Sequence, residues 1–96
     1  MTKELRIEAK VTVLNEAGLH ARPAAQLVHF MHEYKCDATL HRLDDPDEKA
    51  DLRSVLALLM LAAPKGCELG LDVLGEDADK AAEQIVDYFN RSFDEE

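Results

Sequence analysis

The sequence has no tryptophan and only two cysteines among its 96 residues. These two, Cys36 and Cys67, lie far apart and form no CxxC pair, which argues against a redox motif or a thiolate zinc site and for reduced core residues. No stretch approaches the ~20 apolar residues of a membrane-spanning helix. The N-terminus has no long apolar run typical of a signal peptide, so we expect a cytoplasmic protein.

Basic residues are also scarce, with 11 Lys and Arg against 20 Asp and Glu and a formal net charge of −9. Such a surface repels the phosphates of nucleic acids and the headgroups of anionic membranes, so neither is an expected partner. The acid is concentrated in two runs, 44–51 and 76–96, which we interpret as solvated surface. Residues 17–30, by contrast, contain no Asp or Glu.

The length and the 47% hydrophobic content predict a single domain over 1–96 that folds without metal or disulfide bonds. Alternating apolar residues predict strands at 5–13, 37–43 and 67–73, with a short third strand near 48–51. Helical spacing predicts a helix from Ala21 whose apolar stripe reaches Tyr34. It also predicts a helix from 52 or 54 to 63 and a last one over 78–89. The order β-α-β-β-α-β-α favours an α+β fold, with an antiparallel sheet and helices on one face.

His20 lies where the first loop becomes a helix, within Gly18-Leu19-His20-Ala21-Arg22-Pro23-Ala24. The first backbone N–H groups of a helix lack intrahelical acceptors and carry partial positive charge, so Ala21 and Arg22 can hold an anion. Arg22 adds a full charge and a fork of donors suited to phosphate. A neutral imidazole is a competent nucleophile, and a phosphorylated one is a good leaving group, which suits a carrier of phosphoryl groups. On spacing alone, however, capping of the helix explains His20 more simply.

The heptapeptide resembles the active-site signature of HPr, the histidine phosphocarrier family of the bacterial phosphotransferase system. The predicted order of elements is similar to the fold of that family over nearly the whole chain. Residues 54–61 with Lys65-Gly66 resemble its second-helix region. Together with the tail 89–96, they look most like NPr, its nitrogen-related branch. The resemblance implies an open-faced two-layer sandwich, in which three helices cover one face of a four-stranded antiparallel sheet.

The resemblance also implies roles. His20 would be phosphorylated on Nδ1 (the pros nitrogen) by nitrogen-branch enzyme I, which phosphoenolpyruvate feeds, and would pass the group to a histidine of nitrogen-branch enzyme IIA. Arg22 matches the arginine that steadies the phosphate. Ser54 matches a position that a kinase modifies in some sugar-branch members, although helix capping is the favoured interpretation here. The protein would be a monomeric carrier with a regulatory output, would need no cofactor and would not itself be an enzyme.

Residues 55–63 form nine consecutive positions without a polar side chain. A helix on one face of a sheet buries only part of its circumference, so some of Val55, Leu56, Leu59 and Met60 must be exposed. Exposed apolar surface commonly marks a partner site. From composition alone, an unusually well-buried helix is equally acceptable. The family resemblance favours docking, because its members bind partners through this helix and the histidine loop.

Three other interpretations stay open. The chain could be a sugar-branch HPr, or a regulatory module that acts by binding through the apolar second helix. The third, a metal-dependent enzyme that uses His20, His29 and His32, is the least favoured. His29 and His32 lie three residues apart, but no further ligand cluster accompanies them, and we expect no metal.

Overall fold

The computed structural model describes residues 5–95 of the chain. Its elements are four strands, three α-helices and a short terminal turn. The strands are β1 (Leu5–Thr12), β2 (Cys36–Arg42), β3 (Lys49–Asp51) and β4 (Glu68–Gly75). The helices are α1 (Ala21–Met31), α2 (Val55–Met60) and α3 (Ala78–Asn90), followed by a 3-10 turn at Ser92–Asp94. The predicted order β-α-β-β-α-β-α is confirmed.

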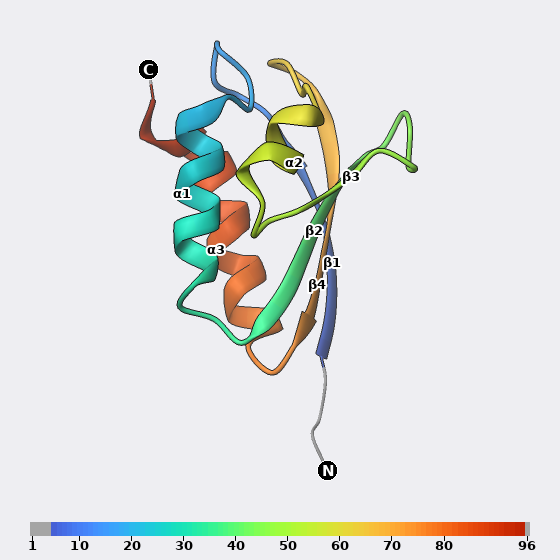
Figure 1. Ribbon diagram of the computed structural model, residues 1–96, viewed down its shortest axis with the longest axis vertical. Coiled ribbons are helices and arrows are strands. Elements are labelled where there is room, and N and C mark those ends of the chain that lie inside the picture. The colour runs from blue at the N-terminus through green and yellow to red at the C-terminus, as the bar shows by residue number, and fades with distance from the viewer. Residues whose placement is uncertain (1–4, 96) are drawn as a thin grey trace.

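The four strands form one antiparallel sheet in the order β1-β4-β2-β3. The last long strand thus lies in the middle, paired with β1 on one side and with β2 on the other. The three helices cover one face of this sheet, with α1 and α3 running along it and α2 near one end (Figure 1). The predicted α+β open-faced two-layer sandwich is therefore confirmed.

Alternation along the strands places the apolar side chains between sheet and helices. In β4, Leu69, Leu71 and Val73 are buried, and in β2 Ala38 and Leu40 are buried, as the period of two predicts. The alternation weakens at the start of β1, where Leu5 is 39% exposed. The helices contribute the other half of the core through residues spaced three and four apart. These are Ala24, Leu27, Phe30 and Met31 of α1 and Ala78, Ala81, Ala82, Ile85 and Phe89 of α3.

The second helix is shorter than predicted. It ends at Met60, and Ala62 already has a φ of +50°, which a right-handed helix does not allow. Arg42 stabilises this reversal, because its Nη1 donates to the carbonyls of Leu61 at 3.2 Å and Ala62 at 3.3 Å. The prediction that the helix continues to residue 63 was wrong, since its apolar run continues beyond the helix as buried Leu61 and Ala63.

The loop before α1 lies against the segment that follows α2. Leu19 N–H donates to the carbonyl of Ala63 at 2.9 Å, and Gly18 has a φ of +74°. A Cβ at Gly18 would stand 2.6 Å from the oxygen of Ala63, so glycine is required for both the conformation and the close approach. This contact holds the start of α1 beside the end of α2.

Within residues 5–95, no helix is long and apolar enough to cross a membrane.

Replacing Gly18 by Ala should lower the free energy of unfolding by about 2 kcal/mol or more, because a positive φ and a backbone overlap act together. Urea unfolding measures the loss. Gly66→Ala is the matched control, since Gly66 also has a positive φ of +91°, but a Cβ there would meet no atom within 4 Å. Gly66→Ala should lower the free energy of unfolding by only about 1 kcal/mol, the cost of a positive φ in a residue other than glycine. Equal losses in the two variants would contradict the close approach at Gly18.

Candidate functional site

His20 occupies the N-cap position of α1 with an extended backbone, φ −98° and ψ −166°. Its carbonyl accepts the first helical hydrogen bond, from Ala24 N–H at 3.1 Å. Its side chain makes no capping hydrogen bond. Capping, the simpler interpretation from spacing, therefore does not account for the imidazole, which is held by other groups.

The start of α1 offers backbone donors next to this ring. Pro23 has no N–H, and for Ala21 and Arg22 no backbone acceptor is found among residues 5–95. Both residues are exposed. The two N–H groups thus lie at the positive end of the 11-residue helix, beside the ring, and anion binding there stays a prediction. Ala24, which follows in the motif, is fully buried and belongs to the core.

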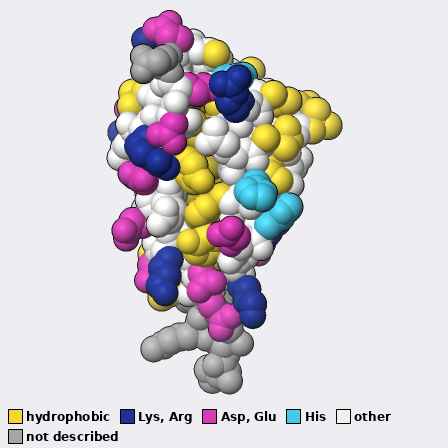
Figure 2. Space-filling model, turned by 90° about the vertical axis from the view of Figure 1, so that its left-hand side faces the viewer, with side chains coloured by type: hydrophobic (Ala, Val, Ile, Leu, Met, Phe, Trp, Pro, Cys, Tyr) yellow, Lys and Arg dark blue, Asp and Glu magenta, His cyan; other side chains and the backbone are white. Residues whose placement is uncertain are grey.

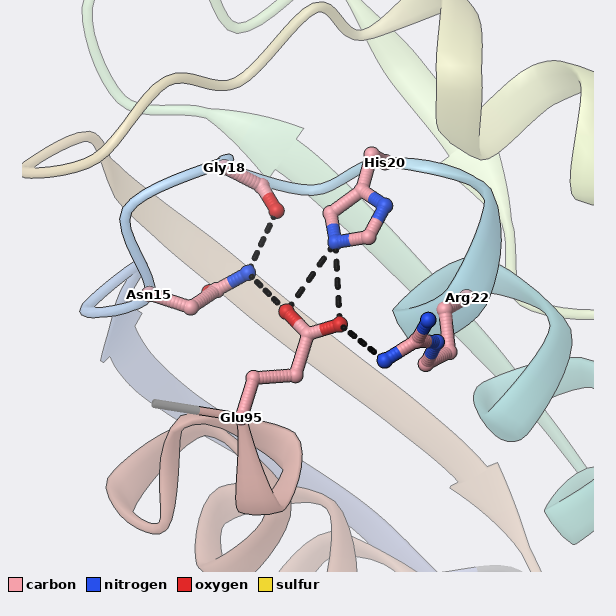
Figure 3. A network of polar contacts seen from close by, with 5 residues as sticks. All are labelled: Asn15, Gly18, His20, Arg22 and Glu95. Atoms are coloured by element: carbon pink, nitrogen blue, oxygen red, sulfur yellow. Dashed lines mark hydrogen bonds and ion pairs between the residues drawn. The ribbon is translucent and has the colours of Figure 1, made fainter.

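The imidazole is paired with a carboxylate from the far end of the chain. Nε2 of His20 lies 3.0 Å from both Oε1 and Oε2 of Glu95 (Figure 3). The two residues are 75 positions apart in the sequence. The side chain of His20 is 36% exposed and that of Glu95 only 13%. The carboxylate therefore lies beneath the ring, and the other ring nitrogen, Nδ1, faces away from it (Figure 3).

Asn15 joins the tail to the loop. Its Nδ2 donates to the carbonyl of Gly18 at 2.6 Å and to Oε1 of Glu95 at 2.9 Å. Both partners are acceptors, so only this orientation of the amide satisfies them. Asn15 is 2% exposed, and its Oδ1 is buried without a hydrogen-bond partner among residues 5–95. The side-chain amide of Asn15 thus donates both to the loop before α1 and to the tail, which together form the site.

A left-handed turn brings Glu95 to the loop. Ser92, Phe93 and Asp94 have φ values of 55°, 55° and 61°, and left-handed backbone costs roughly 1–2 kcal/mol per residue outside glycine. Phe93 anchors the turn, being 2% exposed, with its ring centroid 4.8 Å from Phe89 and 5.8 Å from Tyr88. Burial of this aromatic ring offsets the strain.

The pKa of the Glu95 carboxyl lies below its usual value of 4.5, chiefly because His20 hydrogen-bonds the charged form, with further help from Asn15 and Arg22. A depressed pKa means that the native state favours the carboxylate. Its contribution to stability is fully present above the usual pKa and is lost as the pH falls through the lowered value. The carboxylate is therefore the resting form at neutral pH.

Arg22 projects from the first turn of α1 and is 74% exposed. Its Nη1 lies 3.6 Å from Oε2 of Glu95 (Figure 3). Because the guanidinium is exposed and this contact is long, it contributes little to stability, and Arg22 can turn to another anion at small cost. The structure brings Arg22 beside His20, as the sequence predicted.

The second helix presents apolar side chains to solvent. Leu56 is 68% exposed, Met60 70% and Leu59 38%, while Val55 is partly buried against the core. Leu58 faces the core and is fully buried. Hydrophobic side chains gather at the upper right of the face in Figure 2, at the end of the molecule where Figure 1 places α2. Of the four predicted docking residues, Leu56, Leu59 and Met60 are exposed, and Val55 packs partly against the core.

Ser54 is the N-cap of α2, and its hydroxyl oxygen accepts from Ala57 N–H at 3.1 Å. The capping role favoured from the sequence is thus what the geometry shows. Modification of Ser54 stays a prediction.

The other histidines lie away from this site. His29 in the last turn of α1 and His32 just after that helix are exposed, with ring centroids 6.3 Å apart, and His41 covers Gly70 on the open face of the sheet. Within the described part of the chain, no three His, Cys, Asp or Glu side chains are grouped to hold a metal ion. The hollow of about 600 Å³ on the open sheet face is lined by Arg6, His41 and Lys49 among others, and His20 is not in its lining. The site at His20 lies at the surface of the molecule, where the ring is 36% exposed.

Comparison with known proteins identifies the class of this surface. The chain matches the family described as the HPr component phosphorylation site of the phosphotransferase system over residues 7–91. The chain belongs to the HPr family. HPr-type proteins are phosphocarriers of the phosphotransferase system that carry a phosphohistidine intermediate and are not enzymes, and this chain is an HPr-type phosphocarrier.

Relatives from both branches of the HPr family are similar to the chain. Phosphocarrier protein HPr of Pseudomonas aeruginosa is 40% identical over 86 residues, which cover 90% of this chain and 93% of the relative. Phosphocarrier protein NPr of Escherichia coli K12 is 32% identical over 92 residues, covering 96% and 100%. Among solved structures, HPr-C-His from Thermoanaerobacter tengcongensis superposes with a TM-score of 0.83 at 27% identity, covering 94% and 98%.

Sequence reasoning missed two residues of the HPr site, Glu95 and Asn15. It assigned the acidic run 76–96 to solvated surface, and that interpretation was wrong for Glu95, whose side chain is largely covered. Glu16 is the nearest acid to His20 in the sequence, but its carboxylate pairs with Lys65. Phe93 was the available signal, because an aromatic residue within an acidic tail needs a place in the core and thereby fixes its neighbours.

Replacing Asn15 by Ala should lower the free energy of unfolding by roughly 1–3 kcal/mol, because two hydrogen bonds from a buried amide are lost. Chemical denaturation measures the change. The exposed Asn90 offers a control, since Asn90→Ala at the end of α3 should stay within about 0.5 kcal/mol of the wild type. A wild-type midpoint for Asn15→Ala would show that Asn15 does not hold the tail to the loop.

Proposed function

We propose that His20 is the phosphoryl-accepting residue and that the group is carried on its Nδ1. The observation that supports this most is the state of the ring. Nε2 is engaged by Glu95 at 3.0 Å, whereas for Nδ1 no hydrogen bond is found among the described residues. A nitrogen with a free lone pair is the nucleophile that phosphoryl acceptance needs.

The surroundings of His20 suit a transient phosphate. In the transfer, the lone pair of Nδ1 forms the new N–P bond while the N–P bond of the donor phosphohistidine breaks and its electron pair returns to the donor ring. The N–H groups of Ala21 and Arg22 then lie at the helix terminus that favours negative charge. The exposed guanidinium of Arg22 can leave its long contact with Glu95 and donate to the phosphate oxygens. The reverse step passes the group onward.

We further propose that the donor is nitrogen-branch enzyme I, fed by phosphoenolpyruvate, and that the acceptor is a histidine of nitrogen-branch enzyme IIA. The second helix and the tail resemble the nitrogen-related members, and NPr of Escherichia coli aligns over its full length. The higher identity to an HPr from Pseudomonas aeruginosa favours the sugar branch as the second candidate. In either case we place the protein in the cytoplasm as a monomer.

The exposed side of α2 is proposed as the docking surface for both partners. Leu56, Leu59 and Met60 form it, and the contact between Leu19 and Ala63 holds it beside the histidine loop. Methionine is flexible and polarizable, which suits a surface that must fit two different proteins. The same patch supports the alternative output, regulation of a partner by binding alone.

Incubation with phosphoenolpyruvate and nitrogen-branch enzyme I should give one acid-labile, base-stable phosphate per chain. Mass spectrometry of the intact protein and its peptides locates it, and we expect His20. The variant His20→Ala should carry none, whereas His29→Ala and His32→Ala should react normally, because both side chains are exposed near the other end of α1.

The sugar-branch enzyme I, run in parallel, decides the branch. Faster transfer from that enzyme would contradict the nitrogen-branch proposal while leaving the phosphocarrier role intact. Phosphate on another residue would contradict the assignment to His20.

Leu56→Glu should slow phosphoryl exchange with enzyme I roughly fivefold or more, because a charge enters the apolar centre of the proposed docking surface. The thermal transition should stay near that of the wild type, since the side chain is 68% exposed. Leu74→Glu is the matched control, as Leu74 is also exposed, at 42%, but lies near the far end of β4. An equal effect of the two changes on exchange would count against docking through α2.

A further inference from the structure

The carboxylate of Glu95 determines which nitrogen of His20 can carry a proton. An ionised carboxylate only accepts hydrogen bonds, so the ring nitrogen 3.0 Å away must be the donor. In the neutral ring, a proton on Nε2 leaves the lone pair on Nδ1. A carboxylate that orients an imidazole and selects its tautomer is a recurrent arrangement where histidine acts as a base or nucleophile.

The position of Glu95 is held from several sides. Asn15 donates to Oε1 at 2.9 Å, and Arg22 lies 3.6 Å from Oε2. The backbone N–H of Glu95 donates to the carbonyl of Ser92 at 2.9 Å, closing the left-handed turn. Three consecutive residues in strained backbone precede it, and strain of this kind persists only where the surrounding structure holds it. A side chain that is 13% exposed at the end of an acidic tail is thus fixed in place.

We propose that Glu95 is a positioning residue that makes Nδ1 of His20 the phosphoryl-accepting atom. It holds the ring proton on Nε2 and occupies the space in front of that nitrogen. This inference rests on the proposed function of His20 as the acceptor. No residue of the sequence motif around His20 performs this role, because residues 17–30 contain no acid.

The negative charges of the Glu95 carboxylate and of the phosphoryl group explain why Nδ1 is strongly preferred over Nε2. A phosphoryl group on Nε2 would stand against the carboxylate, and two anions at that distance repel each other. A group on Nδ1 lies on the other side of the ring from Glu95 (Figure 3). When the Nδ1–P bond forms, the ring keeps its proton on Nε2 and becomes positively charged. That proton then remains in its hydrogen bond with Glu95, while the donor atom leaves with the electron pair of the broken bond.

The test uses phosphoramidate, a small donor, so that no protein partner orients the reaction. Its P–N bond breaks, and the nitrogen leaves as ammonia after taking protons from water. We expect the wild type to form Nδ1-phosphohistidine, which phosphorus NMR distinguishes from the Nε2 isomer. In Glu95→Ala the ratio of Nε2 to Nδ1 isomer should rise by about tenfold, the order expected for loss of a charge-assisted hydrogen bond.

A second measurement does not depend on phosphorylation. Nitrogen-15 NMR of the unphosphorylated, neutral ring reports the tautomer directly, and we expect Nε2–H in the wild type and a mixture in Glu95→Ala. Asp94→Asn is the matched control, because Asp94 is the neighbouring acid, lies 3.3 Å from Arg91 and is 66% exposed. It should behave as the wild type in both measurements.

An unchanged isomer ratio together with an unchanged tautomer in folded Glu95→Ala would overturn the role of Glu95 and leave the proposed function standing. A wild-type protein that phosphoramidate modifies at Nε2 would overturn the role of Glu95 and the assignment of the phosphoryl group to Nδ1, but it would leave His20 as the accepting residue. Failure of phosphoramidate to modify His20 in the wild type would instead overturn both proposals, so the two failures are distinguishable.

Discussion

The contact between the Glu95 carboxylate and the His20 imidazole joins the loop before α1 to the tail after α3. It lies at the meeting point of the loop before α1, the first turn of that helix and the turn after α3. Asn15, near the start of that loop, donates hydrogen bonds to both the loop and Glu95. Because each of these segments is attached to a different part of the sandwich, the geometry of the site depends on the whole fold. The left-handed turn at residues 92–94 strains the backbone, and the burial of Phe93 offsets the free energy of that strain.

Backbone strain is concentrated in the segments that surround His20. Ala62 and residues 92–94 are non-glycine residues with positive φ, and they belong to the end of α2 and the tail. Gly18, in the loop before α1, also has positive φ, which glycine adopts without strain. Strain of this kind is tolerated where neighbouring contacts enforce it, here the Leu19 to Ala63 hydrogen bond and the two bonds from Arg42. Contacts with the rest of the sandwich therefore hold the turns at Gly18, at Ala62 and at residues 92–94 in their conformations.

Net charge and local charge differ in this protein. The chain as a whole carries −9, yet the start of α1 has two N–H donors without backbone acceptors in the described residues, a helix terminus and Arg22. The only carboxylate found at the ring within residues 5–95 lies on its Nε2 side, leaving the Nδ1 side to the positive groups. Leu56 and Met60 add exposed apolar side chains to this acidic surface.

The order of elements, the inward faces of the long strands and the start of α1 followed from the sequence alone, because periodicity and proline placement are local properties. Local spacing also located His20 and Arg22 at one helix terminus. The end of α2 did not follow, since its apolar run continues into a turn that Arg42 stabilises from another strand. Glu95 did not follow either. Its position depends on a packed aromatic ring and a strained turn, and contacts across 75 residues leave no periodic signal. The sequence by itself thus determined the fold class and the candidate nucleophile, whereas only the tertiary structure decided which acid faces it and which of its nitrogens is free.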